Sequence, residues 1–292
     1  MKIAAVVVTY NRKDLLKECL ERLLKLEPQV PDVMVIDNGS TDGTKDLIYS
    51  YFKNQILYYN TGKNLGGAGG FAFGLEQAVN AGYDAIWMMD DDTFVEKDSL
   101  EKLVEADNRL NGNYGFLSSI AYWKDGSICN MNRQKVTLRK AIDDFECSEV
   151  PIIMATFVSF FVRRDIVLNV GLPISEFFIW ADDLEYSRRI SQSFSCYAVP
   201  GSKVIHYMGS NNKVGIEQDS DDRLWRYKYL YRNEVYVYRR EGLKGWLYLI
   251  LRVLLHSFRV LRSNQESRGI RLQTIWKSFA EGLHFHPPIK QI

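Results

Sequence analysis

The sequence lacks the features that mark several large classes of protein. Its four cysteines form no CxxC pair and have no zinc-like spacing, so a zinc framework is excluded and reduced thiols of a cytoplasmic protein are expected. The formal net charge is +1, which gives no overall electrostatic attraction to nucleic acid. No stretch is long and uncharged enough to span a membrane, and the first residues have neither the basic region nor the cleavage site of a secretory signal.

What the chain does have is a large apolar fraction in a regular order. Its 292 residues are 46% hydrophobic, enough for one large α/β domain with an appendage. Apolar runs that alternate with segments of helical spacing predict strands at 3–9, 32–36, 55–59 and 85–89, and helices at 12–26, 44–52 and 71–80. This order predicts a mainly parallel sheet covered on both faces, with ligands at the carboxyl ends of its strands.

The second half is less regular. Strands are expected at 116–123 and 152–163, and a helix at 183–191. Beyond Asp219 the sequence interleaves tyrosine and tryptophan with arginine and lysine, and 246–261 is strongly apolar with Arg252, His256 and Arg259 on one helical face. We therefore expect a catalytic domain at 1–215 and a helical, aromatic and basic subdomain at 216–292.

Three consecutive aspartates follow the apolar run that ends at Met89. Like charges side by side repel one another, and a divalent cation with oxygen ligands relieves that repulsion. In an extended segment Asp90 and Asp92 point to one face and Asp91 to the other. The pattern predicts a Mg²⁺ or Mn²⁺ site that holds a diphosphate; a charged turn without a ligand is the alternative.

Polar residues also follow the other strands. Asp37 ends the second strand and could accept a hydrogen bond from a base or a ribose, whereas 40–42 are explained by helix capping. The glycine-rich segment 64–70 lets backbone approach a ligand ahead of a helix, although a flexible turn would have the same composition.

Two further acids, Asp182 and Asp183, come directly after an aromatic cluster at 177–180. One acid can cap the next helix while the other acts as general base on a sugar hydroxyl, and aromatic faces suit sugar C–H surfaces. An ordinary helix N-terminus rich in aspartate is the alternative. His206 ends a short strand, and a lone histidine of this kind is more often structural than a ligand.

Together these motifs resemble the family 2 inverting glycosyltransferases over roughly residues 2–210. The resemblance implies the GT-A fold, a Rossmann-like α/β fold, followed here by a C-terminal helical appendage. It implies that Asp90, Asp92 and His206 bind Mn²⁺ or Mg²⁺, that Asp183 is the catalytic base beside Asp182, and that Phe177, Phe178 and Trp180 shape the acceptor site. The implied nucleotide-sugar contacts are Thr9, Tyr10, Asn11, Arg12, Asp37, Asn64, Gly66, Gly67, Asp90 and Asp91.

Within that family the chain is most similar to bacterial galactofuranosyltransferases, through segments 64–71 and 180–186 and through Pro200-Gly201 with His206. Ala181 separates Trp180 from the two acids, where those enzymes have tryptophan directly before them. The similarity implies transfer of galactofuranose from a UDP-sugar to a glycan or lipid-linked glycan of the bacterial surface. A dTDP-rhamnose-dependent rhamnosyltransferase, a nucleotidyltransferase and a non-catalytic glycan-binding protein are the alternatives.

The aromatic and basic tail allows two interpretations. It could form a helical subdomain that covers the core or joins two copies of the chain. It could instead bind anionic lipid on the inner face of the plasma membrane, since basic and aromatic side chains suit that interface.

Overall fold

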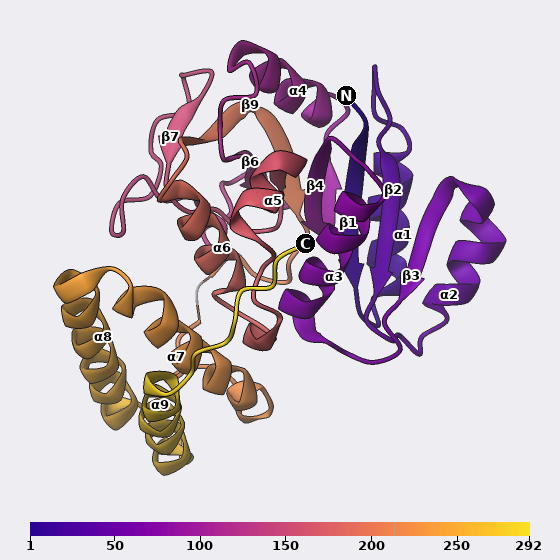
Figure 1. The fold of residues 1–292 in the computed structure, drawn as a ribbon. Helices are drawn as coiled ribbons and strands as arrows, with labels where there is room; N and C mark the ends of the chain where they lie inside the picture. The colour runs from indigo at the N-terminus through magenta and orange to yellow at the C-terminus, as the bar shows by residue number, and fades with distance from the viewer. Residues whose placement is uncertain (213) are drawn as a thin grey trace.

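The computed structural model describes residues 1–212 and 214–292, and within them nine strands form one sheet (Figure 1). The strands are β1 (Ile3–Thr9), β2 (Asp32–Asp37), β3 (Ile56–Asn60), β4 (Ala85–Asp90), β5 (Thr93–Val95), β6 (Phe116–Tyr122), β7 (Val150–Ile152), β8 (Phe160–Arg163) and β9 (Cys196–His206). Their order is β3-β2-β1-β4-β8-β6-β9-β5, with β7 paired to β9. The predicted parallel arrangement is confirmed for β3-β2-β1-β4; of the remaining pairs, β6–β9 is parallel and the others are antiparallel.

Helices cover both faces of this sheet, and three more lie beyond it. They are α1 (Lys13–Leu23), α2 (Thr44–Leu47), α3 (Gly66–Asn80), α4 (Ser99–Arg109), α5 (Arg164–Val170), α6 (Asp182–Ser191), α7 (Leu224–Arg239), α8 (Gly242–Arg262) and α9 (Arg268–Leu283). Every residue of β1 is buried because the strand lies at the middle of the sheet between two helical layers.

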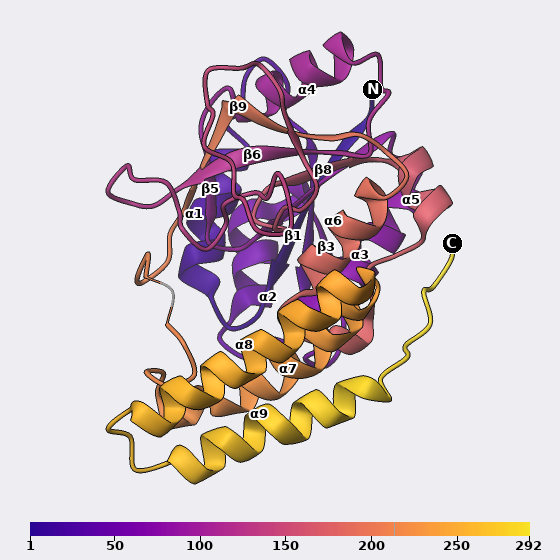
Figure 2. The same cartoon turned by 90° about the vertical axis from the view of Figure 1, so that its left-hand side faces the viewer.

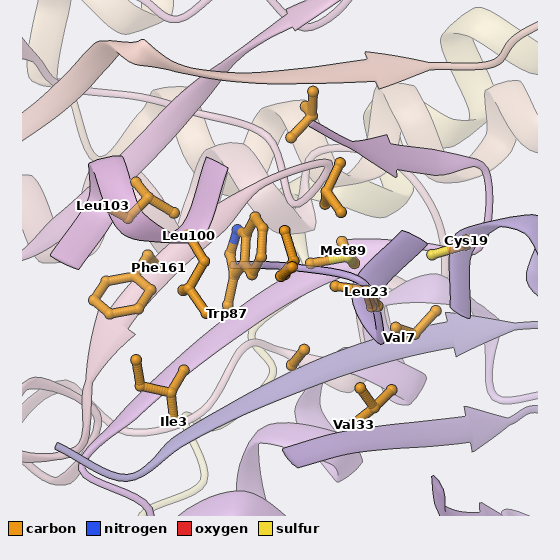
Figure 3. Close-up of a cluster of buried hydrophobic side chains, with 14 of the residues drawn as sticks. Ile3, Val7, Cys19, Leu23, Val33, Trp87, Met89, Leu100, Leu103 and Phe161 are labelled. Carbon is orange, nitrogen blue, oxygen red and sulfur yellow. The ribbon is translucent and has the colours of Figure 1, made fainter. Parts of the chain in front are cut away.

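The alternation of β1 side chains divides the core in two. Ile3, Ala5 and Val7 pack with α1 and α4 on one face, where Trp87 is fully buried (Figure 3). Ala4 and Val6 pack with α3, α5 and α6 on the opposite face. These two layers hold the strands that end at the candidate site.

The prediction of a single strand at 152–163 is wrong. The apolar run 152–163 contains the end of β7 and all of β8, separated by a loop at 153–159. Residues of this loop are buried against α6, where the backbone N–H of Ala155 donates to Ser187 Oγ at 3.1 Å. The run is apolar because it is buried, and burial alone does not require pairing in a sheet.

The C-terminal helices α7, α8 and α9 lie together outside the sheet, α8 and α9 farthest from it (Figures 1 and 2). The chain after α9 returns to the first part of the molecule, where Lys290 O accepts a hydrogen bond from the backbone N–H of Leu172 at 2.9 Å. That residues 216–292 form a separate subdomain stays a prediction.

Candidate functional site

The carboxyl ends of β1, β2 and β4 meet at one edge of the sheet. Thr9 is the register partner of Asp37, and Val8 is the partner of Asp90. Parallel pairing therefore brings the polar residues that follow three separate strands into one place, as the sequence predicted.

The central cluster consists of Asp90, Asp92 and His206. Antiparallel pairing of β5 with β9 places His206 opposite Thr93, directly after the aspartates. One ligand atom from each of the three residues lies within 4.8 Å of the others, and Asp92 Oδ1 is 3.0 Å from His206 Nε2. Two carboxylate oxygens and one imidazole nitrogen form a donor set that fits Mn²⁺ or Mg²⁺, and the nitrogen favours Mn²⁺.

A residue that the sequence did not reveal orients the histidine. His206 Nδ1 lies 2.8 Å from Asn132 Oδ1, and Asn132 Nδ2 donates to Thr156 Oγ1 at 3.0 Å. With the amide in this orientation Nδ1 carries the proton, so Nε2 is left to bind a metal. Asn132 belongs to an irregular segment and no sequence pattern identifies it.

The charges of the cluster favour a cation between the carboxylates. Burial, reinforced by repulsion from Asp92, raises the pKa of Asp90 to about 6. Burial would also raise the pKa of Asp92, but the hydrogen bond and charge of His206 outweigh it and lower that pKa. Burial lowers the pKa of His206, but the hydrogen bond and charge of Asp92 outweigh it and raise that pKa to about 10. The imidazolium thus supplies positive charge beside the carboxylates, and a metal ion bound at Nε2 would take the place of its proton.

The loop after β1 is tied to the aspartates. Thr9 Oγ1 donates to Asp91 Oδ2 at 2.7 Å, and Arg12 Nη1 lies 2.7 Å from Asp92 Oδ2 and 3.3 Å from Asp91 Oδ1. Burial raises the pKa of Asp91 to about 7 even though Arg12 opposes that shift. Tyr10 is exposed beside this network. The structure thus assembles the first predicted nucleotide-binding segment next to the metal-ligand candidates.

The side chains of Asp37 and Asn11 accept hydrogen bonds from neighbouring residues of the protein. Asp37 is fully buried, with Oδ1 accepting from the backbone N–H of Ser40 at 2.7 Å and Oδ2 from the Tyr58 hydroxyl at 2.6 Å. Asn11 Oδ1 accepts from the backbone N–H of Thr41 at 2.7 Å. These bonds fix the loops after β1 and β2, and contact between either side chain and a nucleotide stays a prediction.

The glycine-rich segment has two separate reasons for its composition. Asn64 Oδ1 accepts from the N–H of Gly66, and a Cβ at Gly66 would lie 2.0 Å from Phe178 O. Glycine is therefore required at position 66 because the backbone of Phe178 leaves no room for a side chain. A Cβ at Gly67 would meet no atom within 4 Å, and Gly67 lines the cavity described below, which is consistent with the expected ligand contact.

The two acids at the start of α6 follow a strained loop. Phe178, Trp180 and Ala181 have φ values of 63°, 66° and 65°, although none is glycine. Such conformations cost about 1–3 kcal/mol each and persist only where the surrounding structure enforces them. The loop brings Asp182 and Asp183 into one cavity with Asp90 and His206.

Burial shifts the pKa values of both acids upward. Burial raises the pKa of Asp182 well above its usual range, with repulsion from Asp183 adding to the effect. Burial raises the pKa of Asp183 to about 7, and the positive charge of Lys135 acts in the opposite direction. A general base works best with a pKa near the operating pH, so Asp183 fits that role better.

The aromatic residues before these acids have different surroundings. Trp180 lines the cavity. Phe177 is fully buried against Tyr236, at a ring separation of 5.3 Å, and Phe178 stacks on Tyr229 at 5.0 Å. The structure therefore gives Phe177 a packing position, whereas the sequence pattern led us to expect it in the acceptor site.

The cavity, of about 1490 Å³, extends well beyond the acids. It continues between α7 and α8, where Glu234, Arg252, His256 and Arg259 contribute to its wall. It is large enough for more than one sugar unit, and its far end is rich in basic and aromatic side chains.

Comparison with known proteins identifies the class. The model of a family described as glycosyl transferase family 2 matches residues 4–167. Galactofuranosyltransferase GlfT1 of Mycolicibacterium smegmatis is 25% identical over 284 residues, which cover 86% of this chain and 90% of that protein. Two solved structures resemble the fold, each at 16% identity and over 98% of this chain. Mannosyltransferase PcManGT from Pyrobaculum calidifontis, in complex with GDP-Man and Mn²⁺, has a TM-score of 0.61 with 76% of its chain covered, and S. aureus TarS 1-349, in complex with UDP, has 0.56 with 72% covered.

The likeness to these structures confirms the GT-A fold that the motifs implied. The family model spans more than half of the chain, including nearly all of the strands β1 to β4 that carry the aspartates. The chain belongs to glycosyl transferase family 2.

Proposed function

We propose that this glycosyltransferase transfers galactofuranose from a UDP-sugar to a hydroxyl group of a lipid-linked glycan of the bacterial surface. The observation that carries the proposal is one cavity lined by Asp90 and His206 together with Asp183. A group that can hold a metal and a group that can accept a proton thus border the same space. The similarity to a galactofuranosyltransferase over most of both chains supports the choice of sugar, and one of the two similar structures, TarS, is in complex with UDP while the other holds GDP-Man.

The carboxyl ends of β1 and β2 would bind the donor. Residues 9–12 and Asp37 lie at the adjoining ends of β1 and β2, where they would contact the nucleotide, with the diphosphate beside Asp90 and Asp92. A divalent cation held by Asp90, Asp92 and His206 would neutralise the negative charge that builds up on the departing UDP.

Asp183 would act on the acceptor. Its carboxylate takes the proton from the acceptor hydroxyl as that oxygen forms a bond to the anomeric carbon. The bond from this carbon to the UDP oxygen breaks in the same step, and its electron pair leaves with UDP. Attack from the face opposite the leaving group inverts the anomeric configuration.

The donor is tested by measuring the release of nucleoside diphosphate and of pyrophosphate with a panel of nucleotide sugars, with Mn²⁺ or with EDTA, in the presence of bacterial lipid-linked glycans. We expect metal-dependent turnover with UDP-galactofuranose alone. Turnover with dTDP-rhamnose would contradict the proposed donor sugar but agree with the proposed glycosyl transfer. Pyrophosphate release would indicate a nucleotidyltransferase. If no donor turns over, calorimetric titration with UDP and Mn²⁺ decides, because absence of binding would contradict the proposal.

The distribution of side chains on α8 supports a membrane-bound acceptor. Two of its polar residues, Arg252 and His256, face inward, where Arg252 Nε is 2.7 Å from Glu234 Oε2 and His256 Nδ1 is 2.7 Å from the Tyr231 hydroxyl. Its outward face is a row of exposed apolar side chains, which we call the α8 apolar face: Leu243, Leu247, Ile250, Leu251, Leu254, Leu255, Phe258 and Leu261.

A helix with its polar side turned inward and its apolar side outward is suited to an apolar environment outside the protein. Exposed Lys244, Arg262 and Arg268 flank the α8 apolar face, and basic residues bind anionic lipid headgroups. Among the described residues no helix is long and apolar enough to cross a membrane. We therefore propose that α8 lies on the inner surface of the plasma membrane, with the polar cavity beneath it.

Membrane binding is tested with the double substitution Leu251→Glu/Leu254→Glu. We expect it to lower the affinity for anionic liposomes at low salt by about 100-fold or more, since burying each leucine contributes about 1.5–3 kcal/mol. Leu57→Glu/Leu168→Glu is the matched control, because these leucines are 43% and 40% exposed but lie on the catalytic part of the chain. Equal liposome binding by both variants, or a stable dimer that the first variant dissociates, would overturn the proposal.

A further inference from the structure

The first helix of the aromatic and basic C-terminal segment is α7. One side of α7 lies against the loop 177–181, which leads into Asp182 and Asp183. The proposed reaction uses those acids but leaves α7 itself without a function.

The loop has a conformation that its own sequence does not favour. Phe178 has φ 63° and ψ −58°, and the backbone N–H of Ile179 donates to Phe177 O at 2.7 Å, which closes a γ-turn of the rare, positive-φ type. Trp180 and Ala181 follow with φ values of 66° and 65°. With no glycine among residues 177–181, contacts from outside the loop must maintain this path.

Asn233 of α7 supplies several of those contacts, beside the hydrogen bond that the backbone N–H of Ala68 donates to Phe178 O at 3.2 Å. The Asn233 side chain is fully buried, and its Nδ2 donates to the carbonyl oxygens of Phe177 at 3.0 Å, Ile179 at 3.2 Å and Trp180 at 2.9 Å. The two hydrogens of a single primary amide thus serve three carbonyl groups of the turn, and at least one hydrogen is shared between two of them. Phe177 O also accepts from the N–H of Ile179, but the partly buried carbonyl groups of Ile179 and Trp180 would be costly to leave without a donor, so these bonds favour this conformation over others.

The neighbouring arginine fixes which end of the amide faces the loop. Arg232 donates to Asn233 Oδ1 from Nε at 3.0 Å and from Nη2 at 2.9 Å, and Nη2 also donates to Glu176 O at 2.6 Å. Because the oxygen accepts from arginine, the Nδ2 hydrogens point to the loop. Aspartate at this position would place a second oxygen against the carbonyl oxygens and repel them.

Aromatic rings of α7 hold the side chains of the same loop. Phe178 stacks on Tyr229 with ring centroids 5.0 Å apart, and Trp180 packs edge-on against Tyr227 at 5.1 Å. The backbone and the side chains of the loop are therefore both held by α7, next to a cavity that Trp180 and the two acids line.

We infer that Asn233 is a positioning residue, which sets the direction in which Asp183 enters the cavity by holding the turn at 177–181. The inference rests on the proposed role of Asp183 as the base. It assigns to the segment after the catalytic domain a part in the chemical step, in addition to any part in binding a membrane.

The test compares Asn233→Ala and Asn233→Asp with wild type. We expect kcat to fall about 100-fold in both, because a displacement near 1 Å of a reacting group has an effect of that size. The dissociation constant of UDP with Mn²⁺ should stay within about twofold of the wild-type value, because the proposed cation ligands and the loops after β1 and β2 lie outside the turn. Asn233→Ser, which keeps one donor, should give an intermediate kcat and replaces Asn233→Ala if that variant does not fold.

Tyr231→Phe is the matched control. It removes a partly buried hydrogen bond of the same helix, that between the Tyr231 hydroxyl and His256 Nδ1, without touching the loop. We expect it to lower the melting temperature and to leave kcat within about twofold of wild type. If the Asn233 variants also lower only the melting temperature, the residue is merely structural and the inference is wrong.

A second measurement does not depend on turnover. The chain is labelled with 5-fluorotryptophan, and the ¹⁹F signal of Trp180 is assigned with Trp180→Phe. We expect that signal to shift or broaden in Asn233→Ala and to remain unchanged in Tyr231→Phe. An unchanged Trp180 signal in a folded Asn233 variant would overturn the inference, even if no donor sugar has been identified.

Discussion

Replacement of Asp183 by asparagine is expected to lower turnover by about 10²–10⁴-fold, while binding of UDP and Mn²⁺ stays close to wild type. Asparagine has the same size and can still accept the hydrogen bond that the backbone N–H of Leu184 donates to Asp183 Oδ1 at 2.7 Å. It cannot take a proton from the acceptor hydroxyl. Steady-state kcat and calorimetric titration with UDP measure the two effects separately.

Asp182→Asn is the control for this substitution. Burial and repulsion from Asp183 raise the pKa of Asp182 well above its usual range, which favours the neutral carboxyl and disfavours a role as base. The loss in kcat should therefore be below about tenfold. Near-normal turnover of Asp183→Asn, or a larger loss in Asp182→Asn, would move the base role away from Asp183.

The pH dependence follows from the same assignment. The pKa of Asp183 is raised to about 7, so the carboxyl is protonated, and inactive as a base, below that pH. At saturating Mn²⁺ we expect kcat to fall about tenfold for each unit of pH below the apparent pKa. Because repulsion from Asp90 contributes to the shift, a bound cation should move this acid limb to lower pH, and Asp183→Asn should abolish the limb.

The second large effect concerns the metal. His206→Ala is expected to lower the affinity for Mn²⁺ by more than about 100-fold, since loss even of a residue behind a metal ligand costs about 10–100-fold. Asn132→Ala, which removes the residue that orients the imidazole, should cost about 10–100-fold. Calorimetric titration with Mn²⁺ and UDP measures both losses without an acceptor.

His284→Ala is the matched control, because His284 is exposed near the end of α9. It should bind Mn²⁺ as wild type does. If His206→Ala also binds Mn²⁺ as wild type does, the cluster of Asp90, Asp92 and His206 is not the metal site.

The first half of the fold could be predicted because its signals are local. The strands that became β1, β2, β3 and β4 are continuous apolar runs, and each is separated from the next by a segment of helical spacing. The interpretation of 152–163 as one strand was wrong because the loop between β7 and β8 is buried by α6, and burial leaves the same apolar signal as pairing.

The acids of the site could be predicted, but not the residues that orient them. Asp90, Asp92 and Asp183 are visible at strand and helix ends, where charges are unusual. Asn132 and Asn233 act through hydrogen bonds to residues that are 74 and 53 to 56 positions away in the chain. A single amide in an irregular segment or within a helix leaves no periodic pattern, so no analysis of local sequence finds it.

The chemical groups of the candidate site could be learned from the sequence alone, because the type of each side chain and the apolar periodicity around it are local properties. Three aspartates at the end of a buried strand and two more after aromatic residues are present whatever the rest of the chain does. The resemblance implied that His206 joins Asp90 and Asp92, and the three-dimensional structure shows the three side chains together. That Phe177 packs in the core and that Arg252 and His256 of α8 face inward could be learned from the three-dimensional structure alone. These results depend on which segments meet in space, and the free energy that selects them comes from packing and hydrogen bonds between residues far apart in the sequence.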